Sequence, residues 1–282
     1  MSLKGKVNKI IKFSNVDGPG NRMAIFFQKC NFNCEYCHNP ETINLCKNCG
    51  LCIEGCPTKA LNLKEKKIEW NEELCCECDK CTKICPHNSS PKIYSYTIDD
   101  LLEKIEKVKP FIKGITVSGG ESTLQADFIA ELFIQVKKKW PKLTCFVDTN
   151  GGVNLKDEKY KKLVENTDFF MLDIKAWDKV EHLNITGKDV DTVIENLYFL
   201  RDINKLFEVR SVIVSERINN RLTVEHVSRI ISEKETRYKI IKYRNYGVRE
   251  NMKSNLFSPT DQELKELEEI AKENGVKNTL II

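Results

Sequence analysis

The sequence of 282 residues lacks the features that mark several large classes of protein. It has no long uninterrupted apolar run, and its first ten residues hold no apolar signal-peptide core, so we expect neither a membrane span nor an export signal. Charge of neither sign dominates: 45 Lys and Arg stand against 41 Asp and Glu, spread along the chain. This balance argues against a dedicated nucleic-acid-binding protein. We therefore expect a soluble cytoplasmic protein that binds neither membrane nor nucleic acid.

Histidine is scarce as well, with four residues, and none belongs to a recognisable acid–base or nucleophile constellation. We interpret His38, beside Cys37, as a packing residue of its loop, while His87, His182 and His226 carry no functional signal. The apolar fraction of 41% is nevertheless enough for a folded core. The length suits one large domain, or one domain with a small appendage.

Cysteine is the residue that the sequence has in excess, with 13 in all. Twelve of them lie between Cys30 and Cys85, and only Cys145 stands apart. A secreted disulfide scaffold would be short, with its cysteines distributed along the whole chain. Crowding into one segment of a long chain instead indicates metal or iron–sulfur ligation.

Outside the cysteine-rich segment, short apolar runs alternate with amphipathic helical patterns. Candidate strands are Met23–Lys29, Gly114–Ser118, Leu143–Asp148, Phe169–Ile174, Phe207–Val214 and Tyr238–Tyr243, preceded by Val7–Phe13. Candidate helices are Ile98–Val108 with Thr97 as its cap, Asp127–Lys139, Tyr160–Glu165, Asp189–Asn204, Val224–Ser232 and Asp261–Glu273. This alternation predicts an α/β fold of parallel strands joined by right-handed crossovers. Six such strands are too few for a closed eight-stranded barrel, so a partial barrel or an open doubly wound sheet fits.

Residues 45–91 break the alternation and hold one cysteine spacing twice. Cys46-x-x-Cys49-x-x-Cys52-x-x-x-Cys56-Pro57 recurs as Cys75-x-x-Cys78-x-x-Cys81-x-x-x-Cys85-Pro86. This is the bacterial ferredoxin run, in which the fourth cysteine of each motif ligates the other cluster. The predicted ligand sets are Cys46, Cys49, Cys52 and Cys85 for one cluster, and Cys75, Cys78, Cys81 and Cys56 for the other. Structural zinc is the alternative, and Cys76 is either a spare thiol or an alternative ligand.

A third constellation, Cys30-x-x-x-Cys34-x-x-Cys37, has three cysteines and no fourth at a matching spacing. Three thiolates on a four-iron cluster leave one iron without a protein ligand, and an open metal position is typical of a reactive site. Alternatively, Cys145 or a cysteine of residues 45–91 closes the cluster. Tyr36, just before the last of the three, is placed to pack beside an adenine.

Polar motifs follow the predicted strands. They are Ser118-Gly119-Gly120-Glu121, Asp148-Thr149-Asn150-Gly151, Asp173-Ile174-Lys175 and Arg244-Asn245-Tyr246-Gly247, and the three-cysteine loop itself follows the first parallel strand. Each motif alone is weak, since Asp173-Ile174-Lys175 also fits a strand end with a solvated ion pair. In parallel α/β folds, ligands bind at the carboxyl ends of the strands. Five polar segments at one edge predict a single site with the open cluster at its rim.

These motifs together resemble the radical S-adenosylmethionine (SAM) enzymes, and closely the glycyl-radical enzyme activating enzymes. The resemblance is carried by Asp17-Gly18-Pro19-Gly20-Asn21-Arg22, by Phe26–Cys30 and by Cys34–Glu41. It resumes after residue 91 and covers most of the chain. The family implies a partial (β/α)6 TIM-like barrel formed by residues 1–44 and 92–282. Residues 45–91 resemble the ferredoxin-like domain inserted in many such enzymes.

The resemblance also implies roles for individual residues. Cys30, Cys34 and Cys37 would hold the catalytic 4Fe–4S cluster, whose open iron binds SAM. SAM would further contact Tyr36, Gly119, Gly120, Glu121, Asp173, Lys175 and Arg244, the last standing where such enzymes commonly have His. A monovalent cation would bind at Asp148, Thr149, Met171 and Asp173. The partner protein would meet Asp17, Gly18 and Arg22.

The reaction implied by the resemblance is an anaerobic, reductive one, with no protein side chain as catalyst beyond the cluster ligands. SAM is cleaved to methionine and a 5′-deoxyadenosyl radical, which takes hydrogen from a glycine Cα of a partner glycyl-radical enzyme. The expected partners are that enzyme and a low-potential electron donor, a flavodoxin or ferredoxin. We expect three 4Fe–4S clusters, two of them auxiliary, in a monomer. The alternatives are another radical SAM enzyme, acting on a small molecule or a different protein, and a non-enzymatic iron–sulfur electron carrier.

Overall fold

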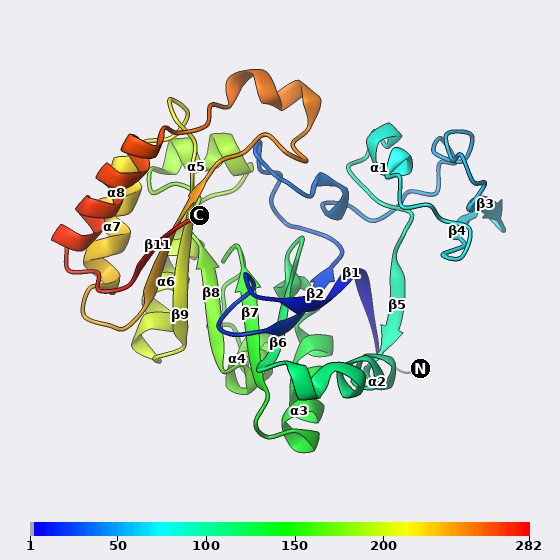
Figure 1. Cartoon of the computed structure of the whole chain (residues 1–282), viewed down its shortest axis with the longest axis horizontal. Coiled ribbons are helices and arrows are strands. Elements are labelled where there is room, and N and C mark those ends of the chain that lie inside the picture. Colours follow the sequence, from blue (N-terminus) through cyan, green and yellow to red (C-terminus); the bar gives the residue numbers. More distant parts are fainter. Residues whose placement is uncertain (1–2) are drawn as a thin grey trace.

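A nine-stranded sheet forms the body of the protein in the computed structural model, which describes residues 3–282. The strand order is β11-β10-β9-β8-β7-β6-β2-β1-β5, and Figure 1 shows the helices α2, α3 and α4 and the helices α6, α7 and α8 flanking it. The strands are β1 (Lys4–Ser14), β2 (Arg22–Phe27), β5 (Tyr94–Thr97), β6 (Gly114–Gly119), β7 (Thr144–Thr149), β8 (Phe169–Asp173), β9 (Leu206–Ile213), β10 (Arg237–Lys242) and β11 (Thr279–Ile281). The helices are α2 (Ile98–Val108), α3 (Ala126–Lys139), α4 (Glu158–Asn166), α5 (Lys179–Thr186), α6 (Asp191–Asp202), α7 (Asn220–Ile231) and α8 (Asp261–Glu273).

The strands from β2 through β6 to β11 are parallel, while β1 pairs antiparallel with both β2 and β5. The α/β class and the parallel sheet are confirmed. The helix predicted at Ile98–Val108 has the predicted bounds, because Thr97 and Asp100 form a capping box at its start. Three elements of this body escaped prediction: β5, β11 and α5. Two of these are strands of three or four residues, too short to show a periodic pattern.

Side chains alternate between two faces of the parallel strands. On β2, Met23, Ile25 and Phe27 pack into the main hydrophobic core beneath the helices. The other face of the sheet is polar: Glu208 on β9 is fully buried and pairs with three cations, Arg210, Arg237 and Lys239. The sheet therefore has one face that packs into the apolar core and another that carries buried charged groups.

Residues 45–91 lie outside this sheet. They contain a separate two-stranded sheet, β3 (Leu61–Lys64) with β4 (Lys67–Trp70), and the short helix α1 (Lys80–Ile84). Figure 1 shows this part of the chain to one side of the large sheet. Its two ends lie together, because Asn44 forms a parallel bridge with Ser89 and its amide donates to the His87 carbonyl.

Within the described residues 3–282, no helix combines the length and the apolar character that crossing a membrane requires.

Candidate active site

The three-cysteine loop begins directly after β2 and returns alongside its own start. Lys29 adopts a left-handed backbone (φ 85°), and the amides of Lys29 and Cys30 donate to the carbonyls of Thr42 and Ile43. Cys34 is buried, and Cys30 and Cys37 are half-buried. The turn thus places all three thiols at the carboxyl edge of the sheet, as the spacing predicts.

Burial changes the chemistry of these thiols. It raises the pKa of Cys30 and of Cys34 to about 12, and it raises the pKa of Cys37 as well. The free thiols therefore stay protonated at neutral pH. Because a metal binds the thiolate, loading iron here must release protons.

Gly119 and Gly120 lie against this loop so closely that no side chain fits at either position. A Cβ on Gly119 (φ 116°) would stand 2.3 Å from backbone atoms of Phe27, and one on Gly120 would stand 2.4 Å from the Lys29 carbonyl. The amide of Glu121 also donates to that carbonyl. The Gly-Gly-Glu segment is therefore joined to the base of the three-cysteine loop.

The Glu121 carboxylate links the end of β6 to the end of β7. Its Oε1 accepts from the Thr123 amide (3.0 Å) and from the hydroxyls of Thr123 and Thr149, and its Oε2 accepts from the Asn150 amide at 2.7 Å. The side chain is buried, and this burial raises the pKa of Glu121 although the hydrogen bonds oppose it. Both oxygens are engaged within the protein, so the contact between Glu121 and SAM stays a prediction.

Asn150 connects this network to the cysteines. Its side-chain amide lies 3.6 Å from the Cys30 sulfur and donates to Asn31 at 2.9 Å. Asn150 belongs to the motif after the third predicted strand, but no role was predicted for it. The geometry makes it a hydrogen-bond donor to the sulfur of Cys30, a predicted cluster ligand.

The proposed cation-binding residues lie on the polar face at β7 and β8, next to Arg210. The guanidinium of Arg210 donates to Asp148 Oδ2 at 2.9 Å and lies 3.0 Å from the Met171 sulfur. Burial raises the pKa of Asp148 to about 6, although Arg210 opposes this, and its Oδ1 is buried without a partner. The Thr149 hydroxyl donates to Glu121 and accepts from the Gly151 amide.

Lys175 and Asp173 form a half-buried ion pair at the end of β8, with Nζ and Oδ2 2.9 Å apart. Burial alone lowers the pKa of Lys175, but the charge of Asp173 outweighs it and raises that pKa well above its ordinary value. Lys175 also lies 5.9 Å from the centre of the Tyr36 ring. Tyr36 is buried in a second small core, and its hydroxyl has no partner.

The Arg244 side chain is exposed, and its backbone, rather than its guanidinium, contacts the three-cysteine loop. The ring Nε2 of His38 lies 2.8 Å from the Arg244 carbonyl. The interpretation of His38 as a packing residue agrees with this contact, while SAM binding by Arg244 stays a prediction.

The Asp17–Arg22 turn requires one correction. Asp17 is half-buried, and Gly18 adopts a backbone (φ 121°) that favours glycine. Arg22, expected to meet the partner protein, is instead fully buried, donates to Thr116 and Thr144 and stacks on Phe146 at 4.1 Å. It supports the turn from below, because its position on β2 directs it to the inner face.

Two further arginines hold the three-cysteine loop, and sequence reasoning missed both. Arg217 makes two 2.8 Å bonds to the Glu35 carboxylate, and Arg249 donates to the Asn33 side chain and to the Cys34 carbonyl, each at 2.8 Å. Each contact joins residues about two hundred positions apart, so no local pattern reveals them.

The two cysteine motifs of residues 45–91 adopt the same backbone. Three matched pairs of positions have left-handed φ values: Asn48 and Glu77, Gly50 and Asp79, Lys59 and Asn88. Matching turn hydrogen bonds also recur, from Cys56 to the Ile53 carbonyl and from Cys85 to the Thr82 carbonyl. The sequence repeat is therefore a structural repeat.

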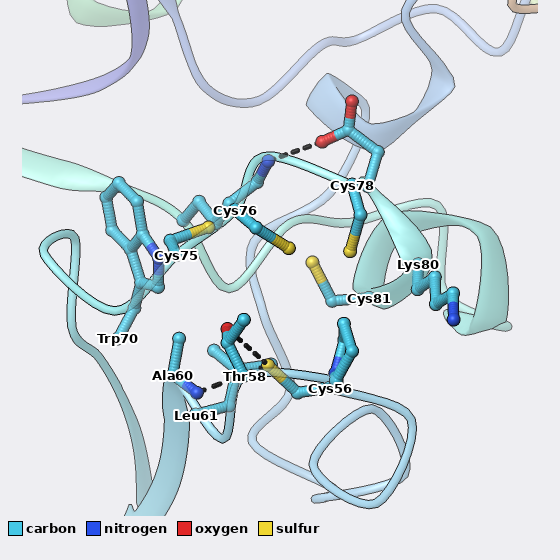
Figure 2. A pocket seen from close by; sticks show the side chains of 13 residues that line it. Cys56, Thr58, Ala60, Leu61, Trp70, Cys75, Cys76, Cys78, Lys80 and Cys81 are labelled. Atoms are coloured by element: carbon cyan, nitrogen blue, oxygen red, sulfur yellow. Dashed lines mark hydrogen bonds and ion pairs between the residues drawn. The ribbon is translucent and has the colours of Figure 1, made fainter.

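Two hollows of about 320 Å³ lie between the copies. One is lined by Cys75, Cys76, Cys78 and Cys81 of the second motif with Cys56 of the first, as Figure 2 shows. The other is lined by Cys46, Cys49 and Cys52 of the first motif with Cys81 and Cys85 of the second. The fourth cysteine of each motif thus lies at the hollow of the other. Among residues 3–282, no three His, Cys, Asp or Glu side chains lie close enough around one point to hold a single metal ion.

Comparison with known proteins identifies the class. The sequence model of the Radical SAM superfamily matches residues 24–216, so the chain is a radical SAM protein. A 4-hydroxyphenylacetate decarboxylase activating enzyme of Clostridioides difficile is 30% identical over 82% of this chain and 78% of its own. An indoleacetate decarboxylase activating enzyme of Tractidigestivibacter scatoligenes is 26% identical over 98% of this chain and 96% of its own. The chain belongs to the glycyl-radical enzyme activating enzymes, and it is an enzyme.

The fold agrees with this assignment. The structure of QueE from Escherichia coli matches 99% of this chain and 94% of the QueE chain, with a TM-score of 0.55 at 12% identity. At this low identity the similarity shows the fold alone. The α/β sheet is consistent with the partial barrels of radical SAM proteins. The family implies one 4Fe–4S cluster and SAM as cofactors.

Proposed function

We propose that the chain activates a glycyl-radical enzyme with a SAM-binding 4Fe–4S cluster held by Cys30, Cys34 and Cys37. The observation that carries the proposal is the convergence of three strand-end segments on the three-cysteine loop. Gly120 packs on Lys29, Asn150 reaches Cys30, and the residues after β10 contact His38. When bound, the cluster and SAM supply the chemistry: reductive cleavage to methionine and a 5′-deoxyadenosyl radical, which takes hydrogen from a glycine Cα of the partner.

The protein residues bind and orient in this proposal. The half-buried Lys175 offers a positive charge to the SAM carboxylate, and we assign Gly119, Gly120 and Glu121, which are joined to the base of the three-cysteine loop, to the SAM amino group. Tyr36 supplies an aromatic face for the adenine, and Arg244 supplies donors near the ribose. No side chain needs to transfer a proton, which fits the few histidines.

A monovalent cation beside SAM fits the residues present. Asp148 Oδ1 is a buried, partnerless anionic oxygen, and Asp173 ends the neighbouring strand. Carboxylate and carbonyl oxygens suit hard cations. We assign Asp148, Thr149, Met171 and Asp173 to that site, with Arg210 fixing the Asp148 carboxylate from its other oxygen.

Residues 45–91 fit a ferredoxin-like domain with two auxiliary 4Fe–4S clusters. Each hollow brings three cysteines of one motif to the fourth cysteine of the other, which is the ligand pattern of the bacterial ferredoxin run. A structural zinc ion would need only one tetrahedral set of four thiolates and no crossing of the motifs. The two clusters offer a path for electrons from a flavodoxin or ferredoxin to the barrel.

The partner surface in this proposal includes the turn at Asp17 and Gly18. Exposed apolar side chains surround it, since Phe13, Val16 and Phe111 are each at least half exposed. A glycyl-radical enzyme is the expected protein substrate, and membership of the activating enzymes supports this class of partner.

Anaerobic reconstitution tests the function directly. Reduction with dithionite in the presence of SAM is expected to release 5′-deoxyadenosine, and addition of the correct partner is expected to give a glycyl-radical signal by electron paramagnetic resonance. Cleavage of SAM with no radical on any candidate partner would favour a radical SAM enzyme with another substrate. Absence of cleavage under strong reductant contradicts the proposed chemistry.

Replacing Asn150 by Ala is expected to lower the reduction potential of the catalytic cluster. The substitution removes an N–H donor from the Cys30 sulfur, and such hydrogen bonds stabilise the reduced, more negative state. One hydrogen bond of about 1 kcal/mol corresponds to a shift on the order of 40 mV for one electron. Potentiometric titration of the catalytic cluster measures this shift.

Asn154→Ala is the control for Asn150→Ala. Asn154 hydrogen-bonds Asp157 away from the cysteines, so its replacement is expected to leave the potential unchanged. An unchanged potential in Asn150→Ala would show that the amide does not interact with the ligand sulfur.

A further inference from the structure

Five cysteine side chains line the hollow in Figure 2, although a four-iron cluster uses four protein ligands. Four of them are the predicted set, and the fifth is Cys76, which nothing in the motif requires. The inference drawn from this excess rests on the proposed assignment of residues 45–91 as a two-cluster domain.

The other motif copy has no counterpart of this fifth thiol. At the position matching Cys76 the first copy has Lys47, so Cys46 has no neighbouring cysteine. The backbone is nevertheless alike, because Asn48 and Glu77 both adopt left-handed φ values at the next position. At this position, therefore, the second copy has a thiol where the first copy has an amine.

The Cys76 side chain is directed toward the ligands of the hollow. Its thiol is exposed, as is that of the neighbouring Cys78, and both side chains line the hollow. In Figure 2 the Cys76 sulfur points to the same space as those of Cys78 and Cys81, and the Cys75 sulfur lies on the side of Trp70. Cys76 is therefore as well placed as Cys75 to complete the set.

Trp70 gives a second, independent indication that the hollow accommodates a fifth sulfur. Its indole Nε1 is buried and has no hydrogen-bond partner, and its ring lines the hollow beside Cys75. An unpaired buried N–H is costly, and the sulfur of a nearby cysteine can accept from it. The site thus offers a donor for the cysteine that is not bound to iron.

We propose that Cys75 and Cys76 are interchangeable ligands of the second auxiliary cluster. In the exchange, the iron–sulfur bond to one cysteine breaks and that to the other forms. The thiol proton of the incoming cysteine passes through solvent to the outgoing thiolate. No electron is transferred, so the oxidation state of the cluster is unchanged. Because this hollow is exposed at Cys76 and Cys78, the reserve ligand would keep a cluster in place after one thiol is oxidised.

Iron analysis of anaerobically reconstituted full-length variants tests the exchange. The wild type is expected to hold about 12 irons per chain, and Cys75→Ala and Cys76→Ala are each expected to keep about 12. Cys46→Ala is the matched control, since Lys47 cannot replace its ligand, and it is expected to keep about 8. Electron paramagnetic resonance of the reduced Cys75→Ala protein should show two auxiliary clusters, one with a changed signal. Size-exclusion chromatography confirms that each variant is folded.

The outcomes separate two kinds of failure. If Cys75→Ala holds about 8 irons and Cys76→Ala about 12, Cys75 is the sole ligand and the exchange is overturned. The reverse result would make Cys76 the sole ligand and would overturn the exchange equally. About 4 irons in the wild type would overturn the two-cluster assignment itself. The single variants decide the question, and a Cys75→Ala/Cys76→Ala protein that folds should fall to about 8 irons.

Discussion

Replacing Cys34 by Ala is expected to abolish SAM cleavage, whereas Cys49→Ala is expected to retain measurable cleavage with a chemical reductant. Cys34 is a buried residue of the three-cysteine loop, and its loss leaves two thiolates for the catalytic cluster. Cys49 lines a hollow between the motif copies, in the part of the chain outside the large sheet. Dithionite delivers electrons without a relay, so the catalytic cluster can be reduced even when an auxiliary cluster is missing.

The two variants are matched in iron content. Each loses one cluster and is expected to hold about 8 irons per chain, so a difference in 5′-deoxyadenosine yield reports which cluster was lost and not how much iron remains. Alanine is used at both positions because a serine hydroxyl can still ligate iron. Equal loss of cleavage from both variants would contradict the division into catalytic and auxiliary clusters.

The elements that the sequence predicts well have signals close together in the chain. Helix α2 is an example, since the capping box of Thr97 and Asp100 lies within four residues and defines its first turn. The cysteine repeat is another, because the spacing alone predicts that Cys56 joins the second motif, and the structure places it at that hollow. In both cases the residues that determine the structure lie close together in the sequence.

The residues that the prediction misplaced or missed make contacts between distant parts of the sequence. A charged residue such as Arg22 suggests a surface contact, but side chains alternate along β2 and this one points to the inner face. There its guanidinium donates to Thr144 and stacks on Phe146. Arg249 contacts Cys34 only because the loop after β10 folds back over the three-cysteine loop. A single sequence shows neither relation, since it does not specify which strand ends become neighbours.

Glu121→Gln is expected to lower the melting temperature of the protein by roughly 5–10 °C, the equivalent of about 3 kcal/mol for a chain of this size. The carboxylate accepts four hydrogen bonds, two of them from the backbone amides of Thr123 and Asn150. A glutamine amide has one oxygen, and its NH2 group would face donors, so at least one backbone N–H loses its acceptor in a buried site. Thermal unfolding of the reconstituted protein, followed by circular dichroism under anaerobic conditions, measures the change.

Glu131→Gln is the matched control, because the Glu131 carboxylate accepts from Gln135 and Lys162 at the surface of α3. Its replacement is expected to change stability by no more than about 0.5 kcal/mol. Equal melting temperatures for the two variants would show that the Glu121 network does not stabilise the site. SAM added to the wild type should raise the melting temperature, because a ligand that binds only the folded state stabilises it. If Glu121 also binds the amino group of SAM, Glu121→Gln should lose that increase as well, which separates its role in holding the strand ends from a role in binding.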